Sequence, residues 1–429
     1  PGPKARIGPF QFADGWSRGN AATVWAASLS TIGLAAFMSF MQPYLLAQML
    51  DVPTGQQGRL TGGLGALREL VAMLLGGFVG AWSDRLGRRS VYVAGLVIMG
   101  LGLAVVPLAT SIPELVAFSL LFAVGVSIAP LMLSACVVDA IQEPCRGRWL
   151  ASNNLLQAVG ILLMSLVLAK TPLWYANLGA SEQAAGRYAF WTAGAICLAV
   201  ALVLWLGLPR TAPNRERARQ AGVLPQIARA LAYSRQNPRL ALAFAAAFIG
   251  RGDFTVIGYF FSLWVTQVGI AEGLSAGQSL ARAGMLFGII QLAAVAWAFA
   301  MGMIMDRVNR VTGIALAFGL ATVGYAVLGQ VGDPFAPGFF GIALLVGAGE
   351  SSVIVAAGAL LGQEARVEHR GPVVGFYSAL GACGILFATA VGGLLYDRIG
   401  PAAPFTMMAI LNAALLVAAL FLRRRQAPP

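Results

Sequence analysis

The chain has 429 residues, of which 58% are hydrophobic and only 11% are charged, whereas a typical soluble domain is about 25% charged and about 45–50% apolar. This composition excludes a soluble enzyme, a disordered chain and a disulfide-rich secreted domain. The net charge of +12 would suggest nucleic-acid binding in a soluble protein. Because membrane proteins collect basic residues in their cytoplasmic loops, we assign the charge to membrane topology and expect no nucleic-acid partner.

Twelve apolar segments are long enough to cross a bilayer, since a transmembrane helix needs about 20 apolar residues. They are Ala22–Leu50, Leu60–Trp82, Val91–Leu108, Leu115–Ala140, Trp149–Leu168, Tyr188–Leu208, Leu240–Val268, Leu280–Met305, Thr312–Leu328, Phe339–Leu361, Pro372–Leu395 and Phe405–Leu422. Continuous apolar runs of this length are helices, because only helices and closed barrels can cross a membrane. The predicted fold is therefore an all-α integral membrane protein with twelve transmembrane helices in two six-helix bundles.

The longest polar connection, residues 209–238, separates an N-terminal bundle (1–208) from a C-terminal bundle (239–429). Within it, Val223–Arg235 is predicted to be either a helix on the membrane surface or a solvated basic linker. If the N-terminus lies inside and the spans alternate, 22 of the 29 basic residues fall in inside segments, five fall outside and two lie within spans. This asymmetry predicts cytoplasmic termini, and we expect a multi-pass protein of a bacterial inner membrane.

The cysteines and the histidine give no sign of a metal centre. Cys136, Cys145, Cys197 and Cys383 form no CxxC pair, and His369 is the only histidine. Disulfide frameworks and soft-metal sites usually show close pairs of such residues. We therefore predict no metal site and no cofactor, and the lack of a GxxxxGK[ST] loop argues against ATP coupling.

Two motifs recur at nearly one offset along the chain. Gly80-x-x-x-Asp84-Arg85-x-x-Arg88 follows the second span, and Gly302-x-x-x-Asp306-Arg307-x-x-Arg310 follows the eighth span. The interval from Arg146-Gly147 to Arg370-Gly371 is almost the same as the interval between these two motifs. The shared offset indicates duplication of a six-helix unit, and parallel repeats about the membrane normal are a known plan of transporters.

The stretch Gly80-Ala-Trp-Ser-Asp84-Arg85-Leu-Gly87-Arg88-Arg89 resembles the cytoplasmic signature between helices two and three of the major facilitator superfamily. Gly302–Arg310 resembles its degenerate second copy, with Asn309 in the place of Gly87. The resemblance covers the whole chain and implies a secondary transporter that works by alternating access of two bundles. The proline-containing stretch of helix five that is usual in drug/proton antiporters of the superfamily is missing, because Trp149–Gly160 has no proline.

In the family this motif forms a cytoplasmic latch. Gly80 would allow close helix packing, Asp84 would meet donors at a helix N-terminus, and Arg88 would bridge Asp84 to Asp139. By analogy, Asp306, Arg310 and Glu364 would form a second latch. The other members of the predicted gating set are Arg85, Gly87, Arg89, Gly302 and Arg307. The alternative is positive-inside charge without any latch.

Five ionisable residues fall within spans, where charge is costly and usually faces a cavity or a partner: Arg68, Glu69, Arg251, Asp253 and Glu350. The glycines of Gly250-Arg251-Gly252-Asp253 predict a bend or a close approach of the backbone to a ligand near the middle of the membrane. Arg251 suits an anionic substrate group, and Asp253 or Glu350 would carry a coupling proton. The alternative is an internal ion pair between Arg251 and one of these acids. Arg68 and Glu69 point about 100° apart, so only one of them is expected to line the pathway.

Uncharged polar residues within the spans complete the set of candidates for the cavity: Gln42, Asn153, Asn154, Gln157, Tyr259, Gln291 and Tyr377. Each could instead form a hydrogen bond between helices. The predicted function is a monomeric, proton-coupled symporter of a small organic solute, with a preference for an anion, and not an enzyme. The alternatives are an exporter of drugs or metabolites, a uniporter or metal-ion carrier, and a membrane scaffold or sensor without transport.

Overall fold

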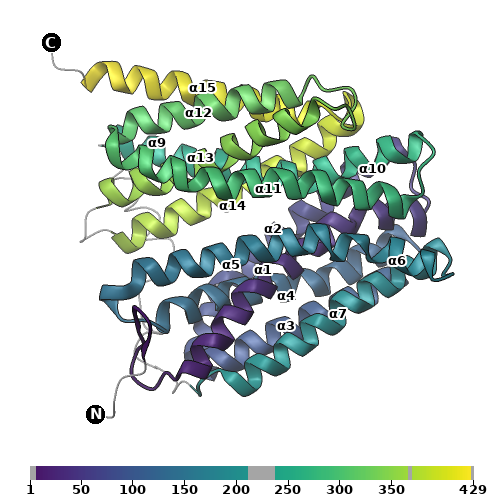
Figure 1. Ribbon diagram of the computed structural model, residues 1–429, viewed down its shortest axis with the longest axis horizontal. Helices are drawn as coiled ribbons and strands as arrows, with labels where there is room; N and C mark the ends of the chain where they lie inside the picture. The colour runs from purple at the N-terminus through teal and green to yellow at the C-terminus, as the bar shows by residue number, and fades with distance from the viewer. Residues whose placement is uncertain (1–5, 211–236, 366–369, 427–429) are drawn as a thin grey trace. The chain divides into compact units, whose positions relative to one another are not determined.

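A computed structural model describes residues 6–210, 237–365 and 370–426 (Figure 1). The helices of the first half are α1 (Arg18–Tyr44), the π-helical η1 (Leu45–Met49), α2 (Thr54–Leu86), α3 (Arg88–Val105), α4 (Ile112–Asp139), α5 (Arg146–Leu166), α6 (Thr171–Asn177) and α7 (Glu182–Gly207). Those of the second half are α9 (Pro238–Val256), the π-helical η6 (Ile257–Phe261), α10 (Ser262–Ala271), α11 (Ala276–Arg307), α12 (Arg310–Leu328), α13 (Phe339–Glu364), α14 (Arg370–Arg398) and α15 (Ala403–Gln426). The predicted linker helix and His369 lie outside the described residues.

The all-α membrane fold is confirmed. Among the described residues, 12 helical segments are long and apolar enough to span a membrane. The second span begins at Thr54 rather than at the predicted Leu60, because its polar first turns find hydrogen-bonding partners that hydropathy does not register. The fifth span continues through a short helical break to Asn177.

The chain divides into two compact units. Unit 1 comprises Pro1–Asp51, Leu67–Gln220 and Ala276–Ala281, and unit 2 comprises Val52–Ala66, Ala221–Ser275 and Arg282–Pro429. Two helices therefore contribute to both units, since the first turns of α2 belong to unit 2 and the first turn of α11 belongs to unit 1.

The helix pairs of the two units repeat one another. Unit 1 packs α1 on α5, α3 on α4 and α3 on α7, and unit 2 packs α9 on α14, α12 on α13 and α12 on α15. The closest approaches repeat as well, since Gly160 lies against the Leu29 carbonyl and Gly384, at the equivalent position of the second half, lies against the Phe248 carbonyl. Glycine permits this approach because it has no Cβ. The repeated packing supports the duplication inferred from the motifs.

The predicted bend at Gly250 and Gly252 is wrong, because α9 runs without interruption through both residues. The glycines instead allow close packing: a Cβ at Gly250 would lie 2.9 Å from Val353 Cγ1 on α13, and one at Gly252 would lie 3.1 Å from Met408 Cε on α15. The irregular turn of this span falls later, in η6.

A short hairpin precedes α1. Its strands are β1 (Arg6–Ile7) and β2 (Phe10–Gln11), and Ala13 N donates to Ala140 O at 3.0 Å. Phe10 packs edge-on against Trp149 at a centroid distance of 5.5 Å. The hairpin thus anchors the start of unit 1 to the connection between α4 and α5.

Candidate functional site

Five buried polar side chains lie at one depth in unit 2. They are Asp253 on α9, Gln291 on α11, Tyr325 on α12, Glu350 on α13 and Asn412 on α15, and we call them the unit 2 cluster. Each lies about four helical turns, roughly 21–24 Å at 1.5 Å per residue, from the helix end on the side of the membrane where α9 begins. All five therefore lie in one layer near the middle of the spans.

The members of the unit 2 cluster lie on helices that pack against one another. Asn412 Nδ2 donates to Asp253 Oδ1 at 2.9 Å and also to Met408 O at 2.9 Å. Gln291 and Glu350 lie on helices that pack closely at this depth, since a Cβ at Gly347 on α13 would lie 2.9 Å from Ala294 N on α11. Asp253, Glu350 and Tyr325 lie at this depth on packed helices, since α9 packs on α13 and α13 packs on α12. Two carboxyl groups and one phenol are therefore buried at one depth of an apolar bundle.

Several polar atoms of the unit 2 cluster form no hydrogen bond. Asp253 Oδ2, Gln291 Nε2, Tyr325 Oη, Glu350 Oε2 and Asn412 Oδ1 are all buried without a hydrogen-bonding partner among the described residues. Leaving one buried polar atom unsatisfied costs about 1–3 kcal/mol. No salt bridge joins Asp253 or Glu350 to a described basic residue, so each carboxyl group needs a bound proton or another cation to remain buried.

Arg251 faces away from the cluster. It is exposed, whereas Asp253 two positions later is fully buried, because residues two apart point about 200° apart on a helix. Its side chain lies toward α14, where a Cβ at Gly381 would be 2.9 Å from Arg251 Cγ, and Tyr377 lies one turn before Gly381 on the same helix. The internal ion pair of Arg251 with Asp253 or Glu350, considered as an alternative, is absent from the described residues.

In unit 1 the buried charge is Arg68. It is 5% exposed and donates to Ser39 Oγ at 3.1 Å and to Gln42 Oε1 at 3.0 Å. Its guanidinium also lies 6.0 Å from the centroid of the Phe122 ring. Glu69 is half-buried on another face of α2. Gln42 thus acts as a partner of Arg68 in unit 1.

The remaining polar candidates differ in their surroundings. Asn153 is buried and joins helices, since its Oδ1 accepts from Ser28 Oγ at 2.6 Å. Asn154 is exposed and Gln157 is half-buried. Tyr259 is half-buried in η6. Asn153 is therefore accounted for by interhelical hydrogen bonding, which was the alternative for every residue of this set.

The first motif forms the predicted contacts of Arg88. Its Nε lies 3.1 Å from Asp139 Oδ2, and its Nη2 lies 3.6 Å from Asp84 Oδ1. Gly87 has φ +86°, a left-handed conformation that favours glycine, and this turn directs Arg88 toward α4. Gly80 does not pack closely as expected, because a Cβ there would meet no described atom within 4 Å. Elsewhere in the motif, the Arg89 guanidinium lies 4.3 Å from the centroid of the Trp205 ring and Arg85 is exposed.

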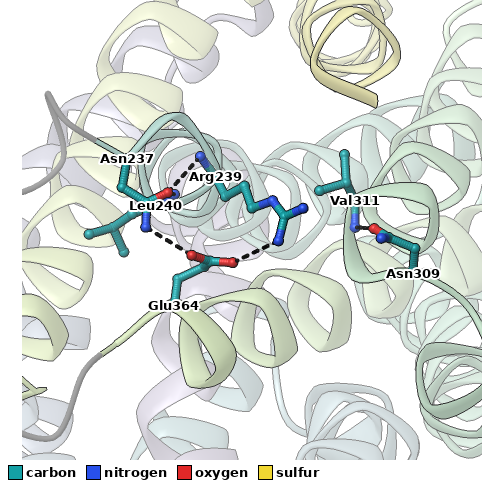
Figure 2. A network of polar contacts seen from close by, with 6 residues as sticks. All are labelled: Asn237, Arg239, Leu240, Asn309, Val311 and Glu364. Carbon is teal, nitrogen blue, oxygen red and sulfur yellow. Dashed lines mark hydrogen bonds and ion pairs between the residues drawn. The ribbon is translucent and has the colours of Figure 1, made fainter. Parts of the chain in front are cut away.

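The predicted second latch is only partly present. Arg310 pairs with Asp306 at 3.5 Å, but the Asp306 side chain is 77% exposed, so the pair contributes little stability. Glu364 does not join it, which corrects the prediction. Glu364 instead accepts from Asn237 at 2.8 Å and pairs with Arg239 at 3.5 Å; both contacts are drawn in Figure 2.

The caps of two helices explain why Glu364 does not join Asp306 and Arg310. Asn237 caps α9 by accepting from Arg239 N at 3.1 Å, which places its side-chain amide beside Glu364. Asn309 caps α12 by accepting from Val311 N at 2.9 Å, with φ −57°, so the turn differs from that at Gly87 (Figure 2). Neither Gly302, where a Cβ would meet no described atom, nor the exposed Arg307 adds a contact.

Unit 2 contains a polar group that was not predicted from the sequence. It lies at the ends of the spans that are opposite to the start of α9. Asp397 at the end of α14 accepts from the backbone N–H groups of Gly58 and Arg59 at 2.8 Å each, and it pairs with the Arg59 side chain at 3.4 Å. Gln267 bridges Gln57 and Tyr396 nearby. Asp397 was not recognisable in the sequence, because it lies at a span end where charges are common.

Among the described residues, twelve helices long and apolar enough to span a membrane form two units with the same packing, which is the architecture of secondary transporters. The sequence profile of the Major Facilitator Superfamily matches residues 23–335 and 275–429. The chain belongs to this superfamily.

Relatives and solved structures agree with the assignment. The chain is 26% identical to the magnetosome protein MamH of Paramagnetospirillum magneticum strain AMB-1, over 90% of this chain and 88% of MamH. It is 27% identical to the magnetosome protein MamZ of Magnetospirillum gryphiswaldense, over 89% of this chain but 59% of MamZ. The nucleoside transporter NupG matches with a TM-score of 0.71 and 12% identity, over 96% of this chain and 100% of NupG. The xylose transporter XylE of E. coli matches with a TM-score of 0.66 and 16% identity, over 96% of this chain and 97% of XylE.

Proposed function

We propose that this transporter moves a small organic solute with an anionic group and couples the movement to protons. Arg251 binds the anionic group, with Tyr377 beside it. Asp253 and Glu350 carry the coupling protons. The observation that carries the proposal is the separation of charges on α9: Arg251 is exposed and lacks an ion pair with any described residue, whereas Asp253 is buried at the same depth as a second acid.

The chemistry of each group supports its role. An arginine at mid-membrane depth is costly unless it faces water or a partner, and its planar guanidinium fits a carboxylate or phosphate. A buried carboxyl group without a cation remains neutral by holding a proton, and it can release this proton when the pocket becomes hydrated. Alternating exposure of the two sites would then link substrate binding to proton release.

The test uses purified protein in liposomes. A ligand screen by thermal shift at two pH values first identifies a substrate class and reports proton linkage. Arg251→Lys is then expected to weaken substrate binding about tenfold or more, because a charge-assisted hydrogen bond contributes about 1.5–3 kcal/mol. Asp253→Asn and Glu350→Gln are each expected to impair uptake driven by a pH gradient. Full coupled uptake by both acid variants would refute the proton assignment.

The sorting of basic residues supports a membrane orientation with both termini in the cytoplasm. We propose the bacterial inner membrane as the location and a monomer as the working state. The relatives are named magnetosome proteins, which makes a magnetosome membrane the second candidate location. A C-terminal fluorescent fusion, imaged in cells and examined by size-exclusion chromatography with light scattering, tests location, orientation and oligomeric state.

A further inference from the structure

We propose that the unit 2 cluster also binds one divalent metal ion of the hard, oxygen-preferring class, in exchange for two protons. This inference rests on the proposed function in one respect, because it takes the cluster to be the site of the coupling ion. It adds a second occupant of that site.

The donor set fits such an ion. Four unpartnered, buried oxygen atoms come from four different helices: Asp253 Oδ2, Tyr325 Oη, Glu350 Oε2 and Asn412 Oδ1. Rotation of the Gln291 amide, whose nitrogen also has no partner, would supply a fifth oxygen. Hard divalent cations prefer carboxylate and carbonyl oxygens and complete their coordination with water. The cluster contains no thiol or imidazole that would favour a softer metal.

The charge of the cluster also fits. In the mid-membrane layer of the described unit 2 helices, the charged side chains are Arg251, Asp253 and Glu350, and the nearby phenols are Tyr325 and Tyr377. Arg251 is exposed toward α14, so it does not neutralise the two acids. The buried acids are neutral either with two protons or with one divalent cation.

The exchange balances in charge and atoms. The Asp253 and Glu350 carboxyl groups lose one proton each to water, the cation takes their place between the two carboxylates, and no oxidation or reduction occurs. A coordinated cation would engage the four unpartnered oxygens of Asp253, Tyr325, Glu350 and Asn412 at once.

The test uses the full chain in lipid nanodiscs with Mn²⁺ alone as the probe, measured by electron paramagnetic resonance. We expect one bound ion per chain and the release of up to two protons, recorded with a pH indicator in weak buffer. The affinity for Mn²⁺ should rise with pH, because protons compete for the same oxygens. Asp253→Asn and Glu350→Gln should each lower this affinity at least about tenfold, in line with the loss expected when a metal site is perturbed.

Two conservative Tyr→Phe variants distinguish the loss of a metal ligand from misfolding. Tyr325→Phe removes one oxygen and should lower Mn²⁺ affinity several-fold. Tyr92→Phe is the matched control, since Tyr92 is a fully buried tyrosine of unit 1 whose hydroxyl bonds Thr31 at 2.7 Å. It should leave Mn²⁺ binding unchanged.

The outcomes separate this inference from the proposed function. If Mn²⁺ does not bind at millimolar concentration, or binds equally to the Asp253 and Glu350 variants, the cation site is refuted, while uptake driven by protons can still stand. If Mn²⁺ binds as expected but the rate of uptake does not depend on the pH gradient, the cation site is supported and the proposed proton coupling is refuted. Arg251→Lys should retain Mn²⁺ binding in either case.

Discussion

The packing of α9 on α14 can be tested with one methyl group. At Gly384 an added Cβ would collide with the Phe248 carbonyl oxygen and would lie 2.7 Å from the carbonyl carbon and 2.9 Å from the Cα of Phe248. These are backbone atoms, so no side-chain rotation relieves the collision and the two helices must separate. Overpacking of this kind lowers the free energy of unfolding by about 1–3 kcal/mol. We expect the loss for Gly384→Ala to lie at the upper end of this range.

For a unit of this size, 1 kcal/mol shifts Tm by about 2–4 °C, so Gly384→Ala should lower Tm by about 6–12 °C. The assay is thermal unfolding of the purified protein followed by intrinsic fluorescence. Gly375→Ala is the matched control on the same helix, because a Cβ there would meet no described atom within 4 Å. Its Tm should stay within about 2 °C of the wild type. Equal Tm values for the two variants would refute the close approach of α9 and α14.

Three further predictions follow from single contacts. Gly87→Ala should lower stability by about 1–2 kcal/mol in thermal unfolding, because φ at Gly87 is +86° and a left-handed turn is costly for alanine; an unchanged Tm would contradict that turn. Asp139→Asn removes a charged partner of Arg88 and should increase labelling of single cysteines placed at the helix ends around Arg88, and equal labelling would argue against a latch. Gly381→Ala crowds Arg251 Cγ and should weaken substrate binding several-fold with a smaller loss of Tm than Gly384→Ala; unaltered affinity would contradict the role of Arg251.

The first motif could be understood from the sequence because its contacts are largely local. Asp84 and Arg88 are only four positions apart in the sequence, and Gly87 supplies the backbone conformation that turns the chain between them. Asp139 could be added because it lies at the predicted end of the fourth span. The second motif misled the prediction at Glu364, because the choice of its partner depends on Asn237, a capping residue distant in sequence.

The cluster around Asp253 shows the same limit more sharply. The sequence marked Asp253, Glu350 and Gln291 as polar residues within spans, but it gave no reason to connect them with Tyr325 or Asn412. Asn412 is far from Asp253 along the chain, and the two meet only because α15 packs on α9. A lone asparagine or tyrosine in an apolar run has no local pattern that would reveal its partner.

By itself, the sequence determined the class of the protein: its membrane location, its twelve helices, its duplicated halves and its superfamily. These properties depend on hydropathy, motif spacing and the distribution of charge, all of which are linear along the chain. Only the tertiary structure decided the surroundings of the charges, burying Asp253 and Glu350 at one depth of unit 2 and leaving Arg251 exposed. The physical reason is that a side chain's partners depend on the rotation of its helix and on packing against distant helices, and neither is encoded in local sequence. The 11% charged fraction thus marks a membrane protein, while three mid-membrane residues of unit 2 carry the proposed chemistry.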